Sequence, residues 1–188
     1  DIVYKPFMSS EIIESLDDDQ INIYRDVYDM LIRPVMEHDR PQMVGISVVQ
    51  QKQLIPTFTF CKMIKDAFPE THITLGGNII TRIRDMLPGM ENLWELFDSA
   101  IVYEGESAYL KLTEAVKKGD DFSALPNLIY KDGKGVHINK EVFAESLAEL
   151  PPPDFDGLPL EKYFVPQLIL PYLATRGCYW GRCTFCDH

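Results

Sequence analysis

The sequence predicts an α/β fold built on a doubly wound parallel sheet, in which helices cover both faces of the sheet. Three apolar runs rich in β-branched residues, at 43–49, 72–77 and 99–106, are typical of strands buried on both faces. Each run is followed by a segment whose apolar residues recur at helical spacing. Strands and helices that alternate in this way form a parallel sheet with right-handed connections.

An acidic helical segment is expected before the first strand. Apolar residues recur at helical spacing within 9–38, and Pro34 is expected to interrupt the helix before Pro41 ends it. The apolar positions that predict the helix are Ile23, Val27, Met30 and Leu31.

The helices that follow the three strands are marked by proline and glycine. Pro56 suits the first turn of the helix after the first strand, and Pro69 ends that helix. The segment after the second strand, 79–97, contains Pro88 and is expected to be a broken helix. The helix after the third strand has Tyr109, Leu112 and Val116 on one face, and Gly119 is its expected C-terminal cap.

The character of the chain changes after residue 121. The segment NLIYKDGKGVHIN predicts a β-hairpin around Asp132 and Gly133, and the proline-rich stretch 150–166 predicts a semi-extended connector. A short apolar strand, Tyr172 to Thr175, then leads into a cysteine-rich loop. We therefore divide the chain into an α/β domain at 1–121, a hairpin and connector at 122–170, and the start of a further domain at 171–188.

Composition and charge narrow the classes of partner. Of the 188 residues, 46% are hydrophobic and 25% are charged, as in ordinary globular domains. The formal net charge of −11 argues against nucleic acid, because phosphate binding needs clustered Lys and Arg. No run approaches the roughly 20 apolar residues that span a bilayer, and the start DIVYKPFMSS lacks the layout of a signal peptide. We therefore expect a cytoplasmic protein with no membrane span.

Small and polar residues follow each predicted strand. In open α/β sheets, ligands bind beyond the carboxyl ends of the strands. The pair Gly76 and Gly77 permits either a tight turn alone or the close approach of a ligand. The chain contains neither GxGxxG nor GxxxxGK[ST], so the dinucleotide and P-loop signatures are absent. The candidate ligand contacts are Ser47, Val49, Gly76, Gly77, Asn78, Glu104, Gly105 and Glu106.

Three of the four cysteines lie within nine positions near the end of the chain, namely Cys178, Cys183 and Cys186. Such spacing in a chain without a signal peptide favours metal binding over disulfides. The three thiolates can hold a [4Fe–4S] cluster with one open iron, or they can form a closed zinc site together with His188. The fourth cysteine, Cys61, falls in an apolar helix and is expected to be an inert core thiol.

The cysteine loop resembles that of the radical S-adenosylmethionine (radical SAM) enzymes. The lead-in TRGC and the aromatic Phe185 before the last cysteine are features of that family. The family usually has three and then two residues between its cysteines, whereas CYWGRCTFC has four and then two. The order PQMVGISVV, HITLGGN, IVYEGE, hairpin, LPPPDF and cysteine loop is similar to that of members with an N-terminal cobalamin-binding domain.

This resemblance implies a flavodoxin-like, Rossmann-like sheet, incomplete before Asp1, followed by the first strand of a truncated radical SAM barrel. It implies that Ser47, Val49, Gly76 and Gly77 line the slot for the nucleotide tail of cobalamin, with Asn78 and Glu104 to Glu106 at neighbouring strand ends. Cys178, Cys183 and Cys186 would ligate the [4Fe–4S] cluster. The DxHxxG motif is absent and His38 does not fit it, so the sequence names no histidine ligand to cobalt.

The activity that the resemblance implies is reductive cleavage of S-adenosylmethionine to a 5′-deoxyadenosyl radical, with possible methyl transfer to an unactivated carbon. The implied partners are a small-molecule or peptide substrate and a reductant such as a flavodoxin or ferredoxin. The chain begins without Met and ends after the cysteine motif, so we expect a fragment that is inactive alone. The alternative is a non-enzymatic α/β ligand-binding or sensor module with a structural Cys₃His zinc site.

Overall fold

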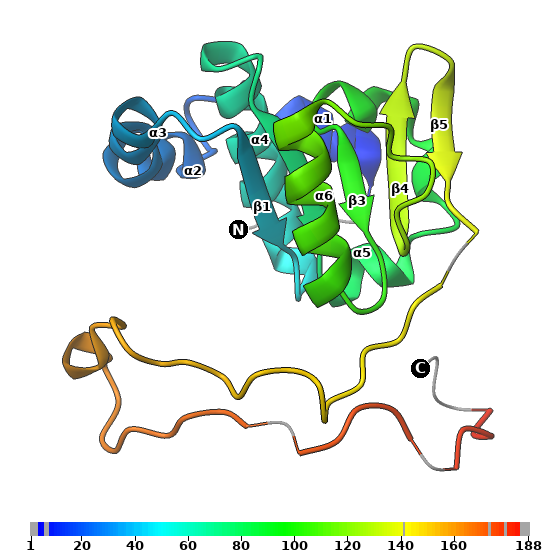
Figure 1. The fold of residues 1–188 in the computed structure, drawn as a ribbon. Helices are drawn as coiled ribbons and strands as arrows, with labels where there is room; N and C mark the ends of the chain where they lie inside the picture. Colours follow the sequence, from blue (N-terminus) through cyan, green and yellow to red (C-terminus); the bar gives the residue numbers. More distant parts are fainter. Residues whose placement is uncertain (1–3, 6–7, 141, 173, 179, 185–188) are drawn as a thin grey trace. The chain divides into compact units, whose positions relative to one another are not determined.

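The computed structural model describes residues 4–5, 8–140, 142–172, 174–178 and 180–184 (Figure 1). The chain divides into two compact units, Asp1–Ala144 and Glu145–His188. The first unit contains the sheet and its covering helices, and it therefore includes the predicted hairpin.

The first unit is a mixed α/β structure around a five-stranded open sheet whose strand order follows the chain, β1-β2-β3-β4-β5. The first three strands are parallel, as predicted, and the hairpin joins them because β4 pairs antiparallel with β3. The sheet is therefore mixed, and the hairpin that we grouped with the connector belongs to it. The strands are β1 (Met43–Ser47), β2 (His72–Gly76), β3 (Ser99–Ile101), β4 (Leu128–Asp132) and β5 (Gly135–Ile138).

The third strand is shorter than the run that predicted it. It ends at Ile101, and the next backbone N–H, that of Val102, donates to the carbonyl of Asn127 at 2.9 Å. Tyr103 then takes a left-handed conformation with φ of 63°, which directs the chain away from the sheet. The expected strand over 99–106 is thus wrong in its second half.

The two faces of the sheet are covered by different helices (Figure 1). The helix α4 follows β1 and packs on one face, and α6 follows β3 and packs on the other. The predicted broken helix consists of α5, a turn and two 3₁₀ segments, Leu87–Gly89 and Glu91–Glu95. The α-helices are α1 (Ser9–Ser15), α2 (Tyr24–Val27), α3 (Arg33–Asp39), α4 (Leu54–Ala67), α5 (Asn78–Arg82) and α6 (Glu106–Lys118).

Pro34 does not break the N-terminal helical segment. It lies in the first turn of α3, and the preceding residues, Tyr28–Ile32, form a π-helical turn that joins α2 to α3. In a π-helical turn each N–H bonds to the carbonyl five residues earlier instead of four. This change of hydrogen-bond spacing comes just before Pro34, which has no N–H to donate. The packed side contains Tyr28 and Met36, which are buried. The apolar positions that predicted the helix are largely exposed instead, including Ile23, Met30 and Leu31.

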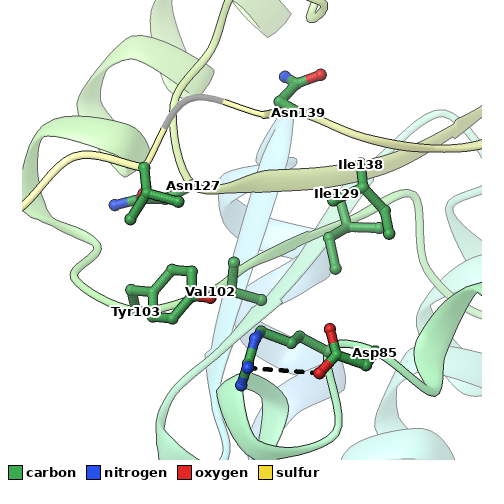
Figure 2. Close-up of a pocket in the computed structure, with 9 residues that line it drawn as sticks. Asp85, Val102, Tyr103, Asn127, Ile129, Ile138 and Asn139 are labelled. Atoms are coloured by element: carbon green, nitrogen blue, oxygen red, sulfur yellow. Dashed lines mark ion pairs between the residues drawn. The ribbon is translucent and has the colours of Figure 1, made fainter.

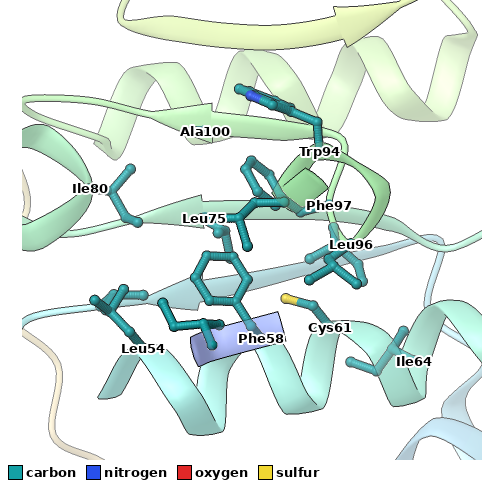
Figure 3. Packing of buried hydrophobic residues seen from close by; sticks show 14 of the residues in the cluster. Leu54, Phe58, Cys61, Ile64, Leu75, Ile80, Trp94, Leu96, Phe97 and Ala100 are labelled. Atoms are coloured by element: carbon teal, nitrogen blue, oxygen red, sulfur yellow. The ribbon is translucent and has the colours of Figure 1, made fainter. Parts of the chain in front are cut away.

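The larger core lies between α4 and the sheet (Figure 3). Phe58 and Cys61 of α4 face Leu75 of β2, and the ring of Trp94 lies 4.5 Å from that of Phe97. The smaller core lies under α6 and contains Ile101, Ala108, Leu112, Leu128 and Tyr130. Across the described ranges, no helix combines the length and hydrophobicity needed to cross a lipid bilayer.

The described part of the second unit, Glu145–His188, is mostly irregular. Its one regular segment among the described residues is a 3₁₀ turn at Leu160–Lys162. The strand expected at Tyr172 to Thr175 is not formed at the described positions 172, 174 and 175. A strand is completed by hydrogen bonds to a neighbour, and the described part of this unit offers no second strand.

Candidate functional site

The ends of β1 and β2 are held together by backbone hydrogen bonds. The N–H of Val48 donates to the carbonyl of Gly76 at 2.8 Å, and the N–H of Ile79 donates to the carbonyl of Val48 at 3.1 Å. Gly77 has φ of 93°, and a Cβ built there would lie 2.7 Å from the Val48 carbonyl oxygen. Glycine is therefore required at position 77, because any side chain there would clash with the loop after β1. Position 76 has room for a side chain, since a Cβ at Gly76 would meet its nearest atom at 3.6 Å.

The loop after β1 is fixed by the side chain of Gln53. Its Oε1 accepts hydrogen bonds from the N–H groups of Val49 at 2.7 Å and Gln50 at 2.9 Å. The side chain of Val49 is exposed, as is Ser47 at the end of β1. Of the predicted contacts, Ser47, Val49, Gly76, Gly77 and Asn78 thus lie together at one edge of the sheet.

The third group of predicted contacts lies at the start of α6. Gly105 precedes α6 and Glu106 is its first residue, while the carbonyl of Glu104 accepts a hydrogen bond from Asn127 at 2.8 Å. Tyr103, which the sequence analysis missed, donates its N–H to Thr81 Oγ1 at 2.8 Å. Its left-handed backbone is unusual for a bulky residue, and the sequence carries no signal for it.

The α6 side of β1 and β2 is built from small residues. Gly45 pairs with Thr74 and Ser47 pairs with Gly76 in the parallel register, so these four residues share one face of the sheet. We call them the small-residue strip. The opposite face of the same two strands carries Val44, Ile46, Ile73 and Leu75, which pack into the larger core.

The strip is covered at one end by a tyrosine ring and contains an unsatisfied hydroxyl. A Cβ built on Gly45 would lie 2.7 Å from Cε2 of Tyr109, so the Tyr109 ring rests on the glycine. Thr74 is 2% exposed, and its Oγ1 has no hydrogen-bond partner among the residues that the structure describes. The sequence analysis placed Tyr109 on the apolar face of its helix and did not single out Gly45 or Thr74.

A separate small cavity of about 90 Å³ lies beside the end of β3 (Figure 2). Its floor includes Val102 and Ile129, both of which belong to the larger core, so it lies away from the strip. Its polar residues are already engaged. Asn127 bonds to Glu104 and Phe143, and the Arg84 guanidinium stacks on Tyr103 and pairs with Asp85 at 3.4 Å. The cavity therefore offers a ligand less unsatisfied hydrogen-bonding capacity than the strip does.

Two of the three clustered cysteines lie in the described part of the chain. Cys178 and Cys183 are exposed free thiols, whereas Phe185, Cys186 and His188 lie outside the described residues. Hydrogen bonds from the backbone of Gly181 and Trp180 lower the pKa of Cys178 below that of an ordinary thiol. The thiolate is the form that binds metal. Among the residues that the structure describes, no group of three potential ligands converges on a metal position.

Cys61 and three of the four histidines lie in α-helices and strands of the first unit, away from the clustered cysteines in the sequence. Cys61 is fully buried in α4, and this burial raises the pKa of its thiol, as expected for an inert core residue. His72 lies in β2 with Nε2 2.8 Å from Ser99 Oγ, and His137 lies in β5 beside Asp132. His38 is exposed near the end of α3.

One curated protein is similar to this chain in sequence. The chain is 26% identical over 158 residues to a Pyrococcus horikoshii protein named as an uncharacterized methyltransferase. The aligned region covers 83% of this chain and 33% of that protein. No protein-family model matches the chain. The chain spans about a third of the length of this curated relative.

Two solved structures are also similar, both of the radical S-adenosylmethionine methyltransferase TsrM from Kitasatospora setae. The complex with tryptophan substrate and a SAM analogue has a TM-score of 0.48 and 17% identity, covering 60% of this chain and 22% of TsrM. The form with cobalamin and a [4Fe–4S] cluster has a TM-score of 0.45 and 16% identity, covering 68% and 24%.

Proposed function

We propose that this chain is the cofactor-binding part of a cobalamin-dependent radical SAM enzyme that transfers a methyl group. The proposal rests first on the spacing of Cys178, Cys183 and Cys186. The hydrogen bonds that favour the thiolate of Cys178 support it, and so does the name of the Pyrococcus horikoshii relative. The sheet is proposed to be flavodoxin-like, and residues 171–188 to begin a radical SAM barrel.

The cysteines would bind three irons of a [4Fe–4S] cluster and leave the fourth iron for S-adenosylmethionine. When bound, the cofactors would supply the one-electron chemistry that cleaves S-adenosylmethionine to a 5′-deoxyadenosyl radical. The cysteine loop supplies thiolates and a backbone with left-handed turns at Gly177 and Gly181. Substrate, whether a small molecule or a peptide, and a reductant such as a flavodoxin or ferredoxin would complete the reaction in the parent protein.

The small-residue strip would hold the nucleotide tail of cobalamin. A flat ring needs a surface without side chains, and Gly45 and Gly76 provide it beside the exposed Ser47. Gly77 would act indirectly, because its contact with Val48 holds the two loops in place. Val49, Asn78 and Glu104 to Glu106 would lie around the rest of the cofactor.

Anaerobic reconstitution tests the iron–sulfur half of the proposal. The chain is incubated with iron and sulfide, and its metal content and visible spectrum are recorded beside a triple Cys→Ala variant at 178, 183 and 186. We expect the wild-type chain to be brown and to bind about four irons per chain. The triple variant should be colourless and should bind no cluster. Cys61→Ala is the matched control and should retain the cluster, because Cys61 is buried in the core. A colourless protein with one tightly bound zinc would refute the proposal and favour the zinc module.

A further inference from the structure

The hydroxyl of Thr74 is an anomaly in the packing of this sheet. Buried polar groups in folded proteins almost always have a hydrogen-bond partner, and an exception calls for a physical cause. Thr74 is paired in register with Ser99 on the next strand. The Ser99 hydroxyl lies 2.8 Å from His72 Nε2, whereas no described residue bonds to Thr74 Oγ1. The smaller core lies on the same side of the sheet and contains Ala108 and Leu112, whose side chains carry no polar atom.

A partly exposed tyrosine side chain lies against the small-residue strip next to Thr74. The register partner of Thr74 on β1 is Gly45, and the nearest side-chain atoms to a Cβ on Gly45 all belong to the Tyr109 ring. Tyr109 is a residue of α6 and is 42% exposed, although its side chain contacts the sheet. Gly45 is exposed at the edge of the sheet, and a rotation of this one ring toward solvent would free the side of Gly45 that faces α6.

We propose that Thr74 is a ligand-binding residue, whose hydroxyl donates a hydrogen bond to a ring nitrogen of a flat heteroaromatic base lying on Gly45 and Gly76. Tyr109 covers this position in the free protein and moves aside when the base enters. The inference rests on the proposed binding of cobalamin, whose benzimidazole base has such a nitrogen when it is not bound to cobalt. It assigns the recognition of the base to a residue outside the predicted contact set.

The test compares Thr74→Val with Thr74→Ser in the 188-residue chain. Valine keeps the shape of threonine and removes the hydroxyl, whereas serine keeps the hydroxyl. Dissociation constants are measured by absorbance titration with cobalamin and with cobinamide, which lacks the nucleotide base. Thermal unfolding of the free protein is measured in parallel.

We expect Thr74→Val to weaken cobalamin binding about tenfold, the effect of one lost hydrogen bond, and to leave cobinamide binding unchanged. Thr74→Ser should stay within about threefold of wild type for cobalamin, because the donor remains. The free Thr74→Val protein should melt at a higher temperature, since it no longer buries an unpaired hydroxyl. Tighter folding together with weaker binding is a signature that a purely structural role would not give.

Two outcomes would overturn this inference alone and leave the proposed function intact. In the first, Thr74→Val binds cobalamin as tightly as wild type. In the second, it loses cobalamin and cobinamide to the same extent, which would indicate a general distortion. If wild type binds neither ligand, both the inference and the proposed cobalamin site fail. The iron–sulfur assay is unaffected by that result, because it depends on the cysteines.

Discussion

Replacing Gly77 by alanine should destabilise the first unit strongly, although the added group is a single methyl. The backbone at Gly77 has φ of 93° and ψ of 176°, a region that is almost exclusive to glycine and costs other residues about 1–3 kcal/mol. The new Cβ would also lie 2.7 Å from the carbonyl oxygen and 2.8 Å from the nitrogen of Val48. Those are backbone atoms, so they cannot rotate away as a side chain could. Crowding the new methyl against them costs a further amount of about 1–3 kcal/mol. We expect a total loss of about 2–6 kcal/mol.

The neighbouring glycine provides the control for this experiment. A Cβ on Gly76 would meet its nearest atom, the carbonyl oxygen of Ile101, at an ordinary 3.6 Å. Gly76→Ala should therefore change the stability by no more than about 1 kcal/mol. Urea unfolding of both variants can be followed through Trp94, which is 3% exposed in the core of the first unit. If Gly77→Ala unfolds within about 1 kcal/mol of Gly76→Ala, the steric argument is wrong.

Two further predictions concern titration and thiol chemistry. Burial lowers the pKa of His72 below its usual 6.5, so the fold favours the neutral ring; its contribution to stability is complete above that value and is lost as the pH falls through the folded pKa. Urea midpoints at pH 7 and pH 5 should therefore differ less in His72→Phe than in wild type, and an unchanged difference would contradict the assignment. With a thiol reagent under native conditions, Cys178 and Cys183 should react at once and Cys61 only after unfolding, because the first two are exposed and Cys61 is buried. Rapid labelling of Cys61 in the folded protein would show that the core opens far more readily than its packing implies.

The parts of the fold that sequence reasoning predicted are those governed by local patterns. The runs at β1 and β2 were recognised as strands from their apolar and β-branched residues, and Asp132 and Gly133 mark the hairpin through turn chemistry. The prediction that β1 is buried on both faces is wrong, because β1 is the edge strand of the sheet and its residues are all partly or largely exposed. The pairing of β4 with β3 could not be read in this way, because it depends on contacts between segments about thirty residues apart. The end of β3 was misplaced because the left-handed conformation of Tyr103 leaves no trace in composition.

The candidate site was partly visible in the sequence. Ser47 and Gly76 were predicted from their place at strand ends, and the register does pair them. Gly45 and Thr74 lie inside the apolar runs and were treated as strand residues. Aligning the two runs in parallel register would have revealed their pairing, since each lies two residues before a predicted contact. The contact of Tyr109 with Gly45 requires the tertiary packing of α6, which no local pattern contains.

The strand order of the sheet has a consequence for how this chain is made. Each strand from β2 to β5 has as its neighbour the strand that immediately precedes it in the chain. A ribosome synthesises the chain from its N-terminus at roughly 5–20 residues per second. Each new strand can therefore add to an edge that already exists, and none has to insert between two strands formed earlier. We expect the first unit to assemble progressively during translation, with the hairpin of β4 and β5 as the last addition to its sheet.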